Sequence, residues 1–304
     1  MADTLIDFSN ELAGIVQRLS PFVVSIAARR RYPSSGLLWS PDVIVTAAHT
    51  IQQDEEIAVT TADGKALAAK LVGRDPGTDL AVLKAELPAP PGVAPGRAEK
   101  VSAGELALVL GRSAQSGANA SLGIISATSG PWRTWRGGEL DGYIRLDARL
   151  FPQSSGGAVI NMRGEIIGIA TSALSRIAGL AIPVATVKRV TEQLLEKGFV
   201  PRGFLGIGVQ SVPLSAELQK KLAIPNQSGL MALAVESGGP AEKAGLLIGD
   251  IVIGLGDVRA EQTSDLQTYS ASGVIGQSLK IRFIRGGELK ESTLTVGERP
   301  GRRN

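Results

Sequence analysis

Two kinds of hydrophobic periodicity follow one another along the chain, and each predicts a different element. Between residues 4 and 18, apolar side chains recur at every third or fourth position, which predicts an amphipathic helix that stops before Pro21. From there to about residue 182, short apolar runs alternate with turn residues, which is typical of strands. These runs lie at 22–27, 36–39, 43–46, 80–83, 106–110, 124–126, 143–146 and 166–170. Roughly a dozen short strands with few helices predict a mainly β domain built as a pair of antiparallel barrels.

A second helix separates this β-rich part from the rest of the chain. Four branched aliphatic residues between 184 and 194 share one helical face, Gly198 follows as a left-handed stop, and Pro201 lies just beyond it. We therefore place a domain boundary at 197–202. The predicted domains are 1–200 and 203–298, with a basic tail over 299–304.

The pattern changes again in the second predicted domain. It predicts strands at 204–212, 230–235, 250–255, 279–284 and 292–296, and helical segments at 215–222, 240–244 and 264–271. A segment of the length of 203–298 with so many short strands favours a compact β-barrel module with two helices.

Composition narrows the classes of chemistry. Hydrophobic residues make up 43% of the 304 residues and aromatic residues only 4%, so the cores must be packed by Val, Ile, Leu and Ala. The chain has no cysteine and one histidine, which excludes disulfides, thiol chemistry and a His-rich zinc centre. No metal or other cofactor is expected.

The net charge is only mildly basic, at +3. Its basic clusters, at 29–31 and 299–303, are short and not interleaved with aromatic residues, so nucleic-acid binding is not expected. No apolar stretch reaches the roughly 20 residues of a membrane span. Acidic residues stand at Asp3 and Asp7, where a signal peptide needs a basic region. A cytoplasmic location is therefore expected, and a periplasmic or secreted one if a leader has been removed.

Three polar residues of the first domain form a candidate catalytic set, namely His49, Asp79 and Ser155. A serine hydroxyl attacks when a base takes its proton, and neutral imidazole is well suited to this near neutral pH. A buried carboxylate fixes the tautomer of the ring and stabilises the imidazolium, and the chain order His, Asp, Ser is that of chymotrypsin. Each residue alone also has a structural interpretation, as a packed histidine, a turn aspartate and a flexible loop serine. Together they favour a serine protease.

The residues beside Ser155 supply the second part of this chemistry. Gly156 and Gly157 allow the sharp turn that leaves room for a substrate carbonyl group. We assign the oxyanion hole to Gln153, Ser154 and Ser155, with the amides of Gln153 and Ser155 as the donors to the developing negative charge.

Longer segments surround the three candidates: 35–49 leads into His49, 72–83 encloses Asp79, and 154–161 contains Ser155. Together with 179–183, these segments resemble the HtrA (Deg) family of trypsin-like serine proteases that carry a PDZ domain. The resemblance covers roughly residues 10–297. It implies a chymotrypsin-like double barrel followed by a PDZ domain, with His49 as general base, Asp79 as its orienting carboxylate and Ser155 as nucleophile. It also implies trimers formed through the N-terminal segment, whereas packing of that segment on its own barrel is the alternative.

One position departs from the family pattern. Gln153 stands where the family usually has glycine in the sequence Gly-Asn-Ser-Gly-Gly. A glycine can adopt backbone conformations that are disfavoured for other residues. Gln153 therefore either restricts the loop to a poorly competent state or already holds a competent one, and the intact neighbours favour the second alternative.

The resemblance also implies where substrates bind. Leu150 and Phe151 would line the primary specificity pocket opposite the segment Ala170, Thr171 and Ser172. No acidic residue stands where a trypsin-like pocket needs one, so we expect a small or medium aliphatic residue before the scissile bond rather than Lys or Arg.

In the second domain, the loop Phe204, Leu205, Gly206 and Ile207 resembles the carboxylate-binding loop of PDZ domains. The resemblance adds Leu266 and Tyr269 as further peptide-binding residues. Such domains bind peptide C-termini by strand addition. A module that only shields the protease is the structural alternative.

The expected function is that of an ATP-independent serine endopeptidase acting on unfolded or damaged proteins. The expected partners are such substrates, C-terminal peptides at the PDZ domain and further copies of the chain. The alternative is a proteolytically weak or silent peptide-binding chaperone on a protease scaffold, which Gln153 keeps open.

Overall fold

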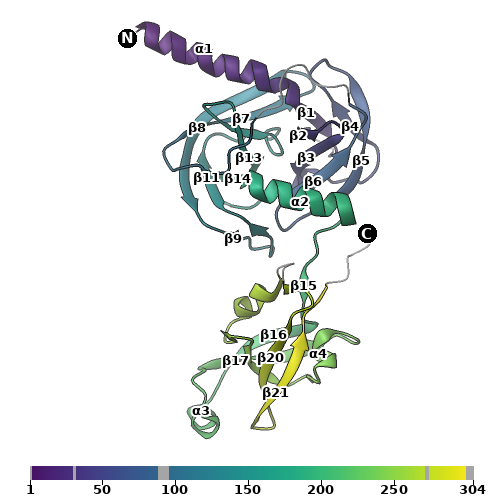
Figure 1. Cartoon of the computed structure of the whole chain (residues 1–304), viewed down its shortest axis with the longest axis vertical. Helices are drawn as coiled ribbons and strands as arrows, with labels where there is room; N and C mark the ends of the chain where they lie inside the picture. The colour runs from purple at the N-terminus through teal and green to yellow at the C-terminus, as the bar shows by residue number, and fades with distance from the viewer. Residues whose placement is uncertain (1, 30–31, 88–95, 271–273, 299–304) are drawn as a thin grey trace. The chain divides into compact units, whose positions relative to one another are not determined.

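The computed structural model describes residues 2–29, 32–87, 96–270 and 274–298, and the chain divides into two compact units, Met1–Val200 and Pro201–Asn304 (Figure 1). The predicted basic tail at 299–304, and residues 30–31 of the short basic cluster, lie outside the described residues. No helix in the described part of the chain has the length and hydropathy needed to cross a membrane.

The first unit begins with a closed antiparallel barrel in the strand order β1-β2-β3-β6-β5-β4. Its interior is filled by aliphatic side chains such as Ile26, Ile44 and Leu83, all fully buried. The strands are β1 (Val23–Ala27), β2 (Ser34–Ser40), β3 (Val43–Ala47), β4 (Ile57–Thr60), β5 (Ala66–Asp75) and β6 (Leu80–Lys84). The sequence pattern does not predict β4 and β5, because the apolar run of β4 is short and Lys70 and Arg74 interrupt that of β5.

A second closed antiparallel barrel follows, in the strand order β11-β14-β13-β12-β7-β8, and confirms the predicted fold class. A short hairpin of β9 (Trp132–Arg133) and β10 (Glu139–Leu140) lies outside it. The barrel strands are β7 (Leu106–Ser113), β8 (Gly117–Ser129), β11 (Tyr143–Asp147), β12 (Ala158–Asn161), β13 (Ile166–Thr171) and β14 (Gly179–Pro183).

Helix α1 (Ala2–Leu19) leads into the first barrel through the 3₁₀ turn η1 (Ser20–Phe22). Its C-terminal half buries Ile15 and Leu19 in the core, whereas its N-terminal half leaves Leu5 70% exposed. Only the C-terminal half of the helix is therefore held by packing on its own barrel.

Helix α2 (Val184–Lys197) lies across both barrels (Figure 1) and contacts β5, β6, β13 and β14. Its predicted apolar face is buried, and Gly198 ends it in a left-handed conformation with φ 78° and an N–H bond to the Leu194 carbonyl. A Cβ on Gly73 of β5 would lie 2.1 Å from the Gly198 carbonyl oxygen. Glycine at position 73 thus lets the end of the helix approach the strand.

The second unit is built on a sheet in the order β16-β17-β18-β20-β21, with β16 at one edge. The predicted single strand over 204–212 is wrong: Gly206, at φ 70°, breaks it into two. The predicted helix over 264–271 is a 3₁₀ helix, η3 (Thr263–Ser270). The other elements are β15 (Gly203–Phe204), β16 (Ile207–Pro213), α3 (Ala216–Leu222), β17 (Ser228–Val235), α4 (Pro240–Lys243), β18 (Ile251–Leu255), β19 (Val258–Arg259), β20 (Ser278–Arg285), β21 (Glu288–Thr295) and β22 (Gly297–Glu298).

Candidate active site

The first barrel supplies His49 and Asp79. His49 lies in the 3₁₀ turn η2 (Ala48–Thr50) directly after β3, and Asp79 lies in the turn between β5 and β6. His49 Nδ1 is 2.8 Å from Asp79 Oδ2, and the His49 backbone amide donates to Asp79 Oδ1 at 2.8 Å. Asp79 is fully buried, whereas 21% of the His49 side chain is exposed. One carboxylate thus holds both the ring and the backbone of the histidine, with the other side of the ring open to a reactant.

Asp79 has an unusual backbone, with φ at 60° for a residue that is not glycine. The turn before it is fixed by Asp75, whose carboxylate accepts hydrogen bonds from the amides of Gly77 and Thr78 and from the Thr78 hydroxyl. The Asp79 carbonyl accepts from the Ala48 amide at 3.0 Å. These contacts hold a strained residue in the position from which it reaches the histidine.

The second barrel completes the surroundings of Asp79. Thr171, at the end of β13, donates its hydroxyl to Asp79 Oδ2 at 2.5 Å. Sequence reasoning placed Thr171 in the specificity pocket, but its hydroxyl is directed to the carboxylate. Asp79 Oδ2 therefore accepts from the threonine of one barrel while it faces the imidazole of the other.

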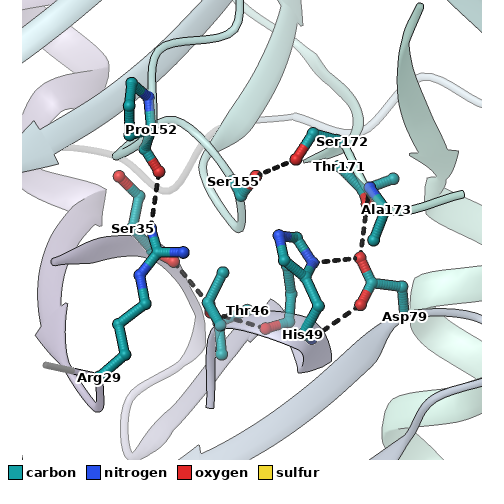
Figure 2. Close-up of polar contacts among 12 residues, drawn as sticks. Arg29, Ser35, Thr46, His49, Asp79, Pro152, Ser155, Thr171, Ser172 and Ala173 are labelled. Carbon is teal, nitrogen blue, oxygen red and sulfur yellow. Dashed lines mark hydrogen bonds and ion pairs between the residues drawn. The ribbon is translucent and has the colours of Figure 1, made fainter. Parts of the chain in front are cut away.

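Ser155 lies in the loop between β11 and β12. Figure 2 shows the imidazole of His49 between Asp79 and Ser155. Within the described residues, the Ser155 hydroxyl makes no hydrogen bond to His49, and its oxygen lies 3.3 Å from the Ser172 hydroxyl oxygen. Catalytic hydrogen bonds are often long or misaligned before substrate binds, and the Ser155 side chain can redirect its oxygen by rotation about χ1.

The glycine after the serine has a steric role. Gly156 has φ at 85°, and a Cβ there would lie 2.1 Å from the Ser35 carbonyl oxygen and 2.3 Å from Thr46 Oγ1. No other residue type fits this backbone without displacing β2. The loop at 148–157, called the nucleophile loop because it carries the candidate nucleophile Ser155, is thus held tightly against the first barrel.

Two residues that sequence reasoning missed hold the carbonyl groups of this loop. Ser35 donates its amide to the Ser155 carbonyl at 3.0 Å and its hydroxyl to the Gln153 carbonyl at 2.6 Å. Arg29 donates from Nη2 to the Pro152 carbonyl at 2.8 Å, as Figure 2 shows. Ser35 belongs to a segment that carries the family resemblance, but no sequence signal points to Arg29.

One hydrogen bond and the sign of φ at Gln153 describe the conformation of this loop. The Ser154 amide donates to the Phe151 carbonyl at 2.8 Å, which closes a β-turn with Pro152 and Gln153 at its centre. Gln153 is absent from the described non-glycine residues with positive φ, which are Glu56, Asp79 and Ala223. Since a type II turn requires positive φ at its third residue, this turn is not type II. Within the described part of the chain, the amides of Gln153 and Ser155 donate to no protein group.

The predicted specificity pocket is only partly exposed. Ala170 is fully buried and Ser172 is exposed. Leu150 reaches β14, because a Cβ on Gly179 would lie 2.5 Å from Leu150 Cδ1. Phe151 is half-buried under the guanidinium of Arg149, whose central carbon is 4.9 Å from the ring centroid. Leu150 therefore fills space at Gly179.

In the second unit, the loop between β15 and β16 also has its carbonyl groups bonded. The Leu205 carbonyl accepts from the Ala241 amide and the Gly206 carbonyl from the Glu236 amide, both at 2.9 Å. Over the residues that the structure describes, the amides of Leu205 and Gly206 have no protein acceptor. Two neighbouring free amides are a suitable site for a carboxylate.

The two other predicted peptide-binding residues lie elsewhere. Leu266 and Tyr269 are buried in the core of the second unit, and the Tyr269 hydroxyl donates to the Leu255 carbonyl at 2.5 Å. Burial raises the pKa of Tyr269 above its usual value. Both side chains contribute to the packing that supports the sheet.

Among the described residues, no group of three or more His, Cys, Asp or Glu side chains could hold a metal ion.

Comparisons with known proteins agree with this geometry. The trypsin-like peptidase domain model matches residues 34–169, and the PDZ domain model matches residues 203–296. Two solved structures cover nearly all of the chain. The HtrA-type protease AlgW with decapeptide is 30% identical with a TM-score of 0.72, covering 95% of this chain and 99% of its own. The serine endoprotease from Yersinia pestis is 30% identical with a TM-score of 0.71, covering 94% of this chain and 97% of its own.

The chain belongs to the HtrA family. This confirms the predicted family. Curated relatives include probable periplasmic serine endoproteases, DegP-like, from Halomonas elongata (31% identical over 96% of this chain) and Brucella suis (32% over 88%). This HtrA chain spans 62% and 52% of the length of those two relatives.

Proposed function

We propose that this HtrA chain is an ATP-independent serine endopeptidase that degrades unfolded or damaged proteins. The observation that carries the proposal is the pairing of His49 with the buried Asp79, with Ser155 on the open side of the imidazole. Relatives of the chain are named serine endoproteases, which favours this function over a proteolytically silent chaperone.

In this mechanism His49 accepts the Ser155 proton through Nε2 as the hydroxyl attacks the substrate carbonyl. Asp79 Oδ2, 2.8 Å from His49 Nδ1, keeps the second ring proton on Nδ1 and stabilises the imidazolium that forms. The imidazolium then protonates the leaving amine, and water hydrolyses the acyl-enzyme by the reverse roles. The negative oxygen of each tetrahedral intermediate requires amide donors, and we assign these to Gln153 and Ser155.

The pocket assignment names the substrate class more closely. Leu150 occupies space against Gly179, and the pocket residues include no carboxylate. We propose cleavage after small or medium aliphatic residues, with Leu150 and Phe151 on one side of the pocket and Ala170 to Ser172 on the other.

A fluorophosphonate probe tests the proposed activity, because it reacts with activated serine nucleophiles. We expect labelling of the wild-type chain and cleavage of unfolded casein. Ser155→Ala should abolish both while circular dichroism and melting temperature stay unchanged. A wild-type chain that binds casein without labelling or cleavage would instead support the chaperone function.

We further propose that the second unit binds peptide C-termini. The free amides of Leu205 and Gly206 would take the terminal carboxylate, and the edge strand β16 would pair with the peptide backbone. Calorimetry with a peptide and its C-terminally amidated form tests this. Equal affinities for the two forms would refute carboxylate recognition.

Compartment and assembly are also proposals. The periplasmic names of the relatives favour the periplasm over the predicted cytoplasm. Leu5, Ile6 and Phe8 are exposed on the N-terminal half of α1, which offers an apolar surface to further copies of the chain. We propose a trimer, for which mass photometry of the wild type and of Leu5→Asp is the test.

A further inference from the structure

The hairpin of β9 and β10 packs against the turn at 75–79, which carries Asp79 and is called the Asp79 turn. The Thr134 hydroxyl of the hairpin donates to the Gly77 carbonyl at 2.7 Å and accepts from the Gly138 amide at 3.0 Å. Thr134 is only 2% exposed. A Cβ on Gly138 would lie 2.1 Å from the Gly77 carbonyl carbon, so the two backbones are in direct contact where only glycine fits. The hairpin therefore holds the Asp79 turn through one side chain and one close backbone approach.

The hairpin is itself fixed to the core and to α2. Leu140 of β10 is buried in the hydrophobic core of the first unit. Directly after β10, the Asp141 carboxylate accepts hydrogen bonds from the Thr186 hydroxyl and from Arg189 Nη2 of α2, both at 2.8 Å. The Thr134 hydroxyl is thus presented to the first barrel from a supported position.

Thr134 and Asp75 hold opposite ends of one peptide group. The peptide between Gly77 and Thr78 has its carbonyl bonded to the Thr134 hydroxyl at 2.7 Å and its N–H bonded to Asp75 Oδ2 at 3.0 Å. A trans peptide is planar, so bonds at its two ends fix the orientation of the whole group. This orientation sets the direction in which the chain reaches Asp79, one peptide further on.

Asp79 needs such support because its φ of 60° is unfavourable for a residue other than glycine. If the turn is released, the backbone at Asp79 can relax and the carboxylate moves away from His49 Nδ1. Thr171 of the second barrel already bonds this carboxylate. The second barrel therefore supports Asp79 in two places, at its side chain through Thr171 and at its backbone through Thr134.

We propose that Thr134 is a positioning residue for the peptidase reaction, because it fixes the Gly77–Thr78 peptide and so keeps Asp79 in the conformation that orients His49. This inference rests on the proposed peptidase function. In the described part of the chain, the Thr134 hydroxyl bonds to backbone groups of the hairpin and of the Asp79 turn. Its effect on the reaction therefore passes through Asp79.

Thr134→Val tests the proposal, because it removes the hydroxyl and keeps a branched side chain of similar size. The substrate is a short peptide with valine before the scissile bond. We expect kcat to fall by about tenfold, the scale of one buried carbonyl left without its hydrogen bond, with KM unchanged. Thr134→Ser restores the hydroxyl and should recover most of the loss.

A second readout uses the single histidine of the chain. In a protein with isotope-labelled histidine, the proton on His49 Nδ1 gives one NMR resonance, and its hydrogen bond to Asp79 Oδ2 moves that resonance downfield. We expect Thr134→Val to shift the resonance upfield and Thr134→Ser to leave it in place. The resonance does not depend on turnover, so it reports the position of Asp79 even in a chain that cleaves nothing.

Thr186→Val is the matched control at the other end of the hairpin. The Thr186 hydroxyl is also buried, donates to Asp141 Oδ2 and accepts from the Asp141 amide, both at 2.8 Å. Arg189 keeps Asp141 bound when that hydroxyl is lost. Thr186→Val should lower the melting temperature about as much as Thr134→Val, while kcat and the His49 resonance keep their wild-type values.

If Thr134→Val does not fold, Thr134→Ala removes the same hydroxyl and takes its place. A wild-type kcat or an unmoved His49 resonance in a folded variant without the hydroxyl would overturn the proposal. An equal loss of kcat in Thr186→Val would overturn it too, because the loss would then come from general loosening of the hairpin. Fluorophosphonate labelling of the wild type that is insensitive to Ser155→Ala would instead refute the peptidase function itself.

Discussion

The nucleophile loop and the Phe204–Ile207 loop present the same kind of group and hold it in different ways. Within the residues that the structure describes, each has two amides that donate to no protein group, and each has carbonyls bonded elsewhere. In the second unit those bonds come from backbone amides, of Ala241 and Glu236. In the first unit they come partly from side chains, those of Arg29 and Ser35.

The two loops also differ in the sign of a backbone φ angle. Gly206 has positive φ, at 70°, whereas Gln153 does not. In the proposed function the second loop binds a carboxylate, a group that is charged before and after binding. The nucleophile loop would instead stabilise a charge that exists only during the reaction. Control by side chains makes that loop adjustable, because a side chain can release a carbonyl without unfolding a strand.

The largest expected effect separates the functions of the two loops. His49→Ala should lower kcat by at least about 10⁴-fold, and His49→Ala combined with Ser155→Ala should be hardly worse, because the residues act as a unit. Affinity of the second unit for a C-terminal peptide should stay the same in both variants. Steady-state kinetics and calorimetry on the full chain check this. Multiplicative losses of activity would show that His49 is not the base for Ser155.

A smaller effect compares the rigidity of the two loops. Gly156→Ala places a Cβ 2.1 Å from the Ser35 carbonyl oxygen at positive φ, so we expect at least about 3 kcal/mol of destabilisation. Gly206→Ala meets its nearest atom, Pro240 Cδ, at 3.1 Å, and strain at positive φ should cost about 1–2 kcal/mol. Urea unfolding of both variants measures the difference. Equal losses would mean that the nucleophile loop relaxes away from β2.

The smallest effect concerns acid stability of the second unit. Asp250 is buried, which opposes its charge, but hydrogen bonds from Arg285 and Leu247 outweigh burial and lower its pKa. A lowered pKa contributes stability above the unfolded value of about 3.9, and this contribution disappears as pH falls through the folded value. Arg285 also donates to the Gly245 carbonyl, four residues after Ala241, whose amide bonds to the Leu205 carbonyl.

Asp250→Asn should therefore lower the melting temperature of the full chain at pH 6 by a few degrees and flatten its decline between about pH 5 and 2. Differential scanning calorimetry checks both. Asp42→Asn, which removes an exposed pair with Lys84, is the control and should change neither. An unchanged pH profile for Asp250→Asn would exclude this pair as a source of acid sensitivity.

The sequence predicts the elements that are apolar throughout and misses what depends on geometry. Helix α2, its stop at Gly198 and barrel strands such as β3, β6 and β7 follow from periodicity and turn residues, whereas β4 and β5 do not. The apolar run around Gly206 predicts one continuous strand, because the sequence does not show that this glycine has a positive φ. The candidates His49, Asp79 and Ser155 stand in distinctive segments. Arg29 does not, because its role comes from a contact 123 residues away along the chain.

The division of the site between two barrels also has a consequence for biosynthesis. His49 and Asp79 are complete once β6 has been made, but Ser155 and Thr171 emerge with the second barrel. A chain still on the ribosome carries the proposed base without the proposed nucleophile, and its Asp79 lacks the bond from Thr171. Because these groups meet only after both barrels close, a half-made copy of the chain lacks the complete site.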